Sequence, residues 1–287
     1  MLVLDLFVFG RSARQISLRQ ALAWSGIWIT LAAGFALLMY HRFGYDTALE
    51  FTTGYVIEFS LSVDNLFLFL IIFRYFQVPA ELQHKVLFYG IIGAIVMRGA
   101  FIIVGIQLIN AFHGIIYIFG AFLVYSGFKL WSQPHVVSPE KNPVLRLFQR
   151  WLPLTANYAG GKFLVRKDKT YATPLLLVLL VVETTDLLFA TDSIPAILAI
   201  TLNAFVVYTS NVFAILGLRS LFFVLAGLME RFYYLHYGLS VVLILIGSKM
   251  LASDYRRIPT STTLMAVAGV LLGSILLSLI RPKNQPS

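Results

Sequence analysis

The sequence predicts an all-α polytopic membrane protein with about eight or nine transmembrane helices. Three observations lead to this class. Hydrophobic residues make up 59% of the 287 residues and charged residues only 12%, whereas a soluble domain carries about 25% charged residues. The apolar residues form long continuous runs, which favours helices over the alternating pattern of a membrane β-barrel. Short polar breaks separate these runs from one another.

Eight apolar runs approach or exceed the roughly 20 residues that a helix needs to cross a bilayer. We expect these spans at residues 21–40, 48–73, 85–110, 113–131, 174–201, 205–229, 232–251 and 262–280. Residues 1–10 are apolar but too short to cross a bilayer alone. They are either the remnant of a first helix, which we favour, or an interfacial segment.

The distribution of basic residues predicts the orientation. The formal charge is +9, but most Lys and Arg lie between apolar runs, so we expect no nucleic-acid partner. If residues 11–20 are cytoplasmic, the basic loop at 132–173 and the C-terminus lie on the same side, as the positive-inside rule requires. The sequence contains no cysteine, which excludes disulfides and thiolate metal ligands within it.

Two segments of three predicted helices, 48–131 and 174–251, resemble each other weakly. In both, an acid pair six residues apart lies in the first helix, an arginine in the second (Arg98 or Arg219), and a Gly-x-Lys sequence near the end of the third. Because three is an odd number and the loop between the units makes no crossing, the units insert with opposite orientation. Transporters built from inverted repeats bind substrate at the bilayer midplane between the repeats.

The other segments of the chain flank these two units. We predict an N-terminal region at 1–47, with the partial span and one full span, and a basic cytoplasmic loop at 132–173. A C-terminal span with a short cytoplasmic tail follows at 252–287.

Acidic residues inside the predicted spans indicate a cation site. Five lie in the motifs EFSLSVDN and ETTDLLFATDS. An Asp at a helix centre facing lipid costs about 2.5–3.5 kcal/mol, so we expect these acids to point inward and converge on one cation. Carboxylate and amide oxygens suit Mn²⁺, Mg²⁺ or Ca²⁺, which the sequence does not separate. The candidate metal residues are Glu58, Asp64, Asn65, Glu183, Asp186 and Asp192.

A purely structural alternative is that these acids pair with Arg98 and Arg219 as buried salt bridges. Five acids exceed two arginines by three charges, which favours cation or proton handling. We predict the two arginines to be structural counter-ions, or gates. At 100° per residue a straight helix cannot aim all three acids of the second motif at one point, so we expect Pro195 to break the helix near Thr191 and re-aim Asp192.

At these residues the chain closely resembles the TerC family of integral membrane proteins, including its Alx-type members. The matching segments cover nearly the whole chain: LDLFVF, ALEFTTGYVIEFSLSVDNLFLF, QHKVLFYGIIGAIVMR, TPLLLVLLVVETTDLLFATDSIPAILAIT and YTSNVFAILGLRSLFF. The resemblance implies a multi-pass protein of the bacterial inner membrane with about nine helices, linked to tellurite resistance by name and to manganese export by function. It places the family's metal residues on Glu58, Asp64, Glu183, Asp186 and Asp192.

The expected function is therefore export of Mn²⁺, by one repeat rocking against the other and with protons as counter-ions, without enzymatic activity or a fixed cofactor. An alternative is a non-transporting assembly or metallation factor that acts beside the secretion machinery or on a secreted metalloenzyme, with a partner surface on the 132–173 loop. An intramembrane aspartyl protease using Asp64 and Asp192 is disfavoured, because the GxGD signature is missing from both motifs. Direct tellurite export is also disfavoured, because carboxylates repel an oxyanion.

Overall fold

The computed structural model confirms the all-α membrane class. It describes residues 18–132, 153–155, 157–166, 168–228, 234–255 and 258–280. The predicted remnant at 1–10, most of the basic loop and the C-terminal tail lie outside these residues. Six helices of the described part are long and apolar enough to cross a membrane, and two further apolar helices are shorter.

All eight predicted spans correspond to helices, whose ends differ from the expected ones by a few residues. These helices are α2 (Leu18–Phe43), α3 (Tyr45–Tyr75), α4 (Ala80–Ala111), α5 (Ile115–Ser132), α7 (Pro174–Leu198), α8 (Ala204–Leu228), α9 (Leu235–Leu251) and α10 (Thr260–Ile280). The apolar runs predict them well because a helix in lipid must satisfy its backbone internally and present apolar side chains over its whole length.

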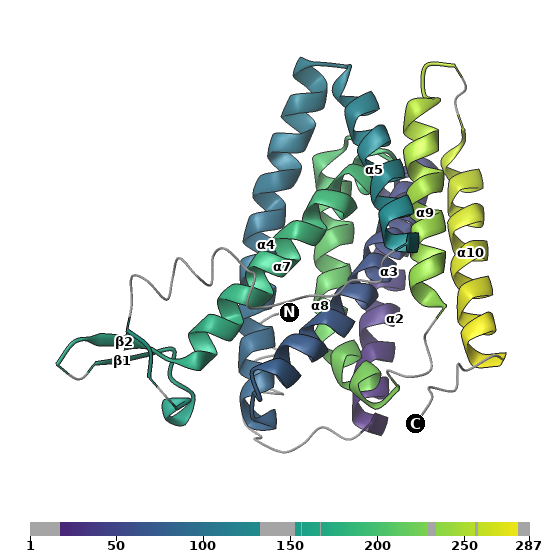
Figure 1. Cartoon of the computed structure of the whole chain (residues 1–287). Helices are drawn as coiled ribbons and strands as arrows, with labels where there is room; N and C mark the ends of the chain where they lie inside the picture. Colours follow the sequence, from purple (N-terminus) through teal and green to yellow (C-terminus); the bar gives the residue numbers. More distant parts are fainter. Residues whose placement is uncertain are drawn as a thin grey trace.

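The two three-helix units run in opposite directions. In Figure 1, α3, α4 and α5 run down, up and down, whereas α7, α8 and α9 run up, down and up. The units also interlock, because each helix of one unit packs chiefly against a helix of the other: α3 against α8, α4 against α7, and α5 against α9. The interior between them is therefore built from both repeats.

Apolar side chains fill this interior in separate clusters. One cluster joins α3, α4, α7 and α8 and includes Phe69, Leu87, Val178 and Phe222. Another joins α3, α5, α9 and α10 through residues such as Ile57, Leu123, Leu243 and Leu271. The polar site described below lies among these packed helices.

Glycines allow the closest of the helix contacts, between α5 and α9. A Cβ atom at Gly247 would lie 2.7 Å from the carbonyl oxygen of Gly120, and one at Gly127 would lie 2.8 Å from the carbonyl oxygen of Ser240. Small residues at such crossings let two backbones approach, which is a common basis of helix association in membranes.

Part of the polar loop folds into a small hairpin, which the sequence did not predict. Strand β1 (Leu164–Arg166) pairs antiparallel with β2 (Thr170–Ala172), so that Val165 lies opposite Tyr171. A short 3-10 turn, η2 (Ala159–Gly161), precedes the hairpin.

This segment is held to the helix ends by polar contacts. The Tyr158 hydroxyl donates a hydrogen bond of 2.6 Å to the Phe76 carbonyl, just after α3. Lys85 of α4 donates one of 2.7 Å to the Gly161 carbonyl. The described part of the loop thus contacts the ends of α3 and α4 of its own chain.

The expected break at Pro195 is not present, so that prediction was wrong. Helix α7 continues through Thr191 and Pro195 and ends at Leu198. Pro195 lies in the last turn of α7. Its missing N–H and the clash of its ring with the preceding turn disturb few hydrogen bonds there, because the helix ends soon after it. Asp192 is therefore presented by a continuous helix.

Candidate cation site

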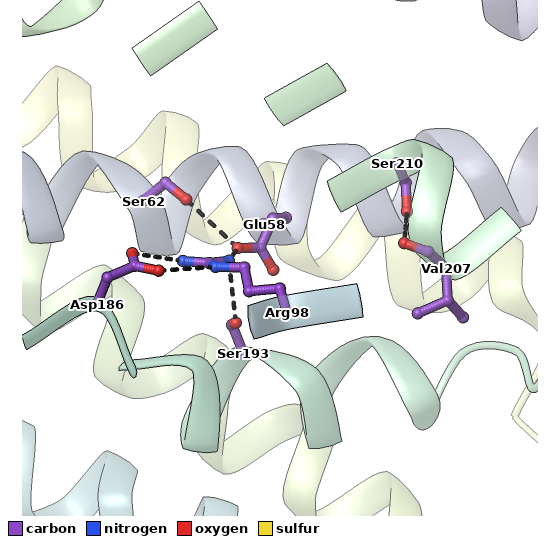
Figure 2. Close-up of polar contacts among 7 residues, drawn as sticks. All are labelled: Glu58, Ser62, Arg98, Asp186, Ser193, Val207 and Ser210. Carbon is purple, nitrogen blue, oxygen red and sulfur yellow. Dashed lines mark hydrogen bonds and ion pairs between the residues drawn. The ribbon is translucent and has the colours of Figure 1, made fainter. Parts of the chain in front are cut away.

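A buried arginine joins carboxylates from both repeats. The Nε and Nη2 atoms of Arg98 donate hydrogen bonds of 3.1 and 2.9 Å to the two carboxylate oxygens of Asp186, and Nη1 forms an ion pair with Glu58. Figure 2 shows the guanidinium between the two carboxylates. Arg98 is 1% exposed, Glu58 0% and Asp186 6%, so the ion pairs are shielded from water.

Each member of this cluster comes from a different helix. Glu58 lies on α3 and Arg98 on α4, both in the first repeat, and Asp186 lies on α7 in the second. A bidentate Arg–carboxylate pair fixes both distance and orientation. The cluster therefore ties α7 to α3 and α4 inside the bundle.

Two serine hydroxyls complete the cluster (Figure 2). Ser62 lies one turn after Glu58 on α3 and donates a hydrogen bond of 3.4 Å to its carboxylate. Ser193 of α7 accepts one of 3.4 Å from Nη1 of Arg98. Ser210, also drawn there, instead donates to the Val207 carbonyl of its own helix.

Glu183 occupies different surroundings, one turn before Asp186 on α7. Its side chain lies against Gly93 of α4, where a Cβ atom would overlap the carboxylate. One carboxylate oxygen of Glu183 is buried and has no hydrogen-bond partner among the described residues. Together with Asp186, Gly90 and apolar side chains, Glu183 lines a small cavity of about 20 Å³, large enough for about one water molecule.

Asp192 faces helix α5. It accepts a hydrogen bond of 2.7 Å from the Ser126 hydroxyl and interacts electrostatically with Lys129 on the same helix. Both partners belong to the first repeat, so this contact also crosses between the repeats. It is a separate polar contact from the one around Arg98.

The structure thus brings together two of the predicted metal residues, Glu58 and Asp186, around a guanidinium. Asn65 is buried at 4% exposure, and the side chains of Asp64 and Arg219 lie outside the described part. Within the residues that the structure describes, no three Asp, Glu or His side chains gather closely enough to hold a metal ion. The assignment of metal ligands therefore stays a prediction.

The spread of the acids along α7 has a geometric cause. Helix α7 stays continuous, so Glu183 and Asp192, nine residues apart, point to opposite sides at 100° per residue. Ser126 was not predicted, because an isolated serine in an apolar run gives no sequence signal. Gly93 was missed for the same reason, although its position across from Glu183 is meaningful once α4 and α7 are placed together.

Comparisons with known proteins give the family. Residues 43–286 match the family described as "Integral membrane protein TerC family". The chain is 47% identical to "Uncharacterized membrane protein STKORF319" of Myxococcus xanthus, over 100% of this chain and 91% of that protein. It is 45% identical to "Putative membrane-bound redox modulator Alx" of Shigella flexneri, over 97% of this chain and 90% of the relative. No solved structure matches. The chain belongs to the TerC family of integral membrane proteins.

Proposed function

We propose that this protein exports a divalent cation, Mn²⁺, from the bacterial cytoplasm across the inner membrane in exchange for protons. The observation that carries the proposal is the meeting of Glu58 and Asp186, one from each repeat, around a single buried positive charge. Inverted-repeat transporters bind their ions between the repeats. We place the cytoplasm at the α3–α4 turn, from the positive-inside rule.

The balance of charge supports a cation as the cargo. The helices carry four described carboxylates of the two motifs, and two basic side chains, Arg98 and Lys129, interact with three of them. The four carboxylates are those of Glu58, Glu183, Asp186 and Asp192. With Asp64 and Arg219 of the same two repeats included, five acids are set against Arg98, Arg219 and Lys129. The balance is −2, the charge that one divalent cation neutralises, and Lys129 accounts for the difference from the excess of three counted against the arginines alone. Uncompensated charge is costly inside a membrane protein, so a cation or protons must supply the balance.

The chemistry of the ligands favours a hard cation. Carboxylate and hydroxyl oxygens are the donors available around Arg98, and such donors suit Mn²⁺, Mg²⁺ and Ca²⁺. The preference for Mn²⁺ rests on the resemblance to the family, because the geometry does not discriminate among these ions.

The guanidinium of Arg98 gives this proposal a mechanism of exchange. A cation that binds between Glu58 and Asp186 must compete with Arg98, which acts as a tethered positive charge. Competition lowers the affinity for the ion and so allows its release. Burial disfavours ionised carboxylates, so protons can also replace the ion, which is the basis for coupling to inward protons.

Cellular manganese tests the proposal. Cells that express the wild type are expected to hold less manganese than cells that express Asp192→Asn or Asp64→Asn at matched membrane levels. Glu81→Gln is a matched control, because Glu81 is an exposed acid in the first turn of α4. Equal manganese in all four strains would refute export.

The alternative, a non-transporting assembly or metallation factor, requires a partner surface on the 132–173 loop. The described residues of that loop contact α3 and α4 of the same chain, which does not favour it. If a variant without the loop still exports manganese, this alternative is excluded. If loop deletion abolishes function and the acid substitutions leave it unchanged, the alternative is favoured.

The name of the Shigella flexneri relative includes redox modulation. The present sequence has no cysteine, so thiol exchange between its own side chains cannot supply a redox activity. We propose that any redox effect follows from the change in cellular manganese.

A further inference from the structure

Helices α5, α9 and α10 form a group with extensive internal contacts. Helices α5 and α9 touch at both ends and in the middle: the Tyr117 hydroxyl bonds to Asp254 just after α9, and the rings of Trp131 and Tyr237 lie 5.0 Å apart at the other end. The glycine contacts described above lie between these points. This antiparallel pair takes one helix from each repeat.

Helix α10 extends this group. The backbone N–H that precedes α9, at Tyr234, donates a hydrogen bond of 2.9 Å to the Ser278 hydroxyl of α10. Gly238 of α9 also lies directly against Ser274. These contacts make α5, α9 and α10 one packed unit, which we call the three-helix group.

The remaining helices, α2, α3, α4, α7 and α8, form a second packed unit, the five-helix group. The Arg98 cluster ties α3, α4 and α7 together. Ring contacts of Phe35 with Phe51 at 5.0 Å and with Phe213 at 4.7 Å join α2 to α3 and α8. The two groups contact each other less than their own helices do.

The hydrogen bond from Ser126 to Asp192 crosses the boundary between the groups. Ser126 lies on α5 in the three-helix group and Asp192 on α7 in the five-helix group. Two electrostatic interactions also cross this boundary, between Lys129 and Asp192 and between Lys249 and Glu50, and an apolar cluster that includes Ile57 and Leu123 spans it. Apolar contacts can slide, whereas a hydrogen bond to a carboxylate must break and re-form.

We infer that the three-helix group moves as one body against the five-helix group during transport, and that Ser126 is a positioning residue that holds Asp192 at the boundary. This inference rests on the proposed transport function. It differs from rocking of whole repeats, because that movement would pull α5 away from α9 and separate their closest backbone contacts. The five-helix group would keep Glu58, Arg98 and Asp186 on one body in either position.

A cross-link between α5 and α9 distinguishes the two movements. The chain contains no cysteine, so a double substitution His113→Cys with Asp254→Cys introduces a single pair. The Nε2 atom of His113, just before α5, lies 3.3 Å from the Oδ1 atom of Asp254, just after α9, and both side chains are exposed. Loss of free thiols on oxidation shows that the disulfide has formed. The experiment measures Mn²⁺ transport into vesicles with the pair reduced and oxidised.

Movement of the three-helix group predicts that oxidation leaves at least half of the reduced rate. Loss of transport on oxidation, with recovery on reduction, would overturn the inference and support rocking of the repeats. Absence of transport in both the wild type and the reduced variant would instead refute the proposed function, so the two failures are distinguishable.

Ser126 is tested in the same vesicles. Ser126→Ala is expected to raise the KM for Mn²⁺ or lower the turnover by roughly tenfold or more, which is the scale of one hydrogen bond to a charged group. Ser126→Thr keeps the hydroxyl and is expected to transport at the wild-type rate. Ser132→Ala is the matched control, because that exposed hydroxyl donates to a carbonyl of its own helix, at Phe128. Equal kinetics for Ser126→Ala and Ser132→Ala would overturn the positioning role.

Discussion

Replacing Arg98 with methionine removes the positive charge between the two repeats and leaves two buried carboxylates facing each other. Glu58 is 0% and Asp186 6% exposed, so water cannot take the place of the lost guanidinium. Removal of one partner from a buried ion pair costs about 3–5 kcal/mol. At about 2–4 °C per kcal/mol, the scale for large domains, the melting temperature should fall by roughly 6–20 °C.

The assay is thermal unfolding of the purified protein in detergent, with and without divalent cations. Without the guanidinium, the carboxylate pair is free to bind a cation, and at a concentration one hundred times Kd such binding adds about 2.7 kcal/mol of stability. Mn²⁺ should therefore restore much of the loss in Arg98→Met, and stabilise the wild type less, because there Arg98 competes. Arg74→Met is the control, because Arg74 is exposed in the last turn of α3.

Two results would refute this reasoning. Equal melting temperatures for Arg98→Met and Arg74→Met would show that Arg98 does not stabilise the bundle through Glu58 and Asp186. A large fall that Mn²⁺, Mg²⁺ and Ca²⁺ all fail to reverse would show that the two carboxylates do not form a cation site.

Two further predictions concern the α5–α9 pair. Gly247→Val should destabilise the protein by about 1–3 kcal/mol through overpacking, because its Cβ atom would lie 2.7 Å from a backbone carbonyl oxygen of α5. Gly269→Val is the control, because a Cβ atom there would meet no neighbouring helix within 4 Å. Equal melting temperatures for the two variants would contradict the close packing. Hydrogen bonds from Tyr117 and, to a smaller extent, His113 lower the pKa of Asp254 in the folded protein. The ionised carboxylate therefore stabilises the fold fully above its unfolded pKa of about 3.9. This stabilisation is lost as the pH falls through the lower folded pKa. Melting curves from pH 7 to 3 should show a smaller acid-induced loss for Asp254→Asn than for the wild type, and identical curves would contradict it.

The helices were predictable because the bilayer acts on each one independently. A span such as α4 must be apolar over its length and must satisfy its own backbone, so its position follows from composition alone. The opposite directions of the two units follow from the number of membrane crossings, because each unit has three helices and the loop between the units does not cross the membrane. The hairpin at 164–172 gave no such signal, because its strands are only three residues long.

The candidate site was predictable in its residue types and not in its partners. The cost of burying Glu58 and Asp186 indicated that they point inward, but the charge count alone could not assign Arg98 to both of them. The contact between Ser126 and Asp192 depends on how α5 lies against α7, which no local pattern encodes. Pro195 was misjudged because its effect depends on its distance from the end of α7.

Uptake of Mn²⁺ into inside-out vesicles under an imposed pH gradient tests the central claim most directly. The wild type should accumulate Mn²⁺ with release of protons from the vesicle, and Glu58→Gln and Asp186→Asn should each abolish this uptake while remaining folded in the membrane. Parallel measurements with Mg²⁺ and Ca²⁺ define the preference among hard cations. Absence of uptake of all three ions by the wild type, or unchanged uptake in both variants, would contradict the account.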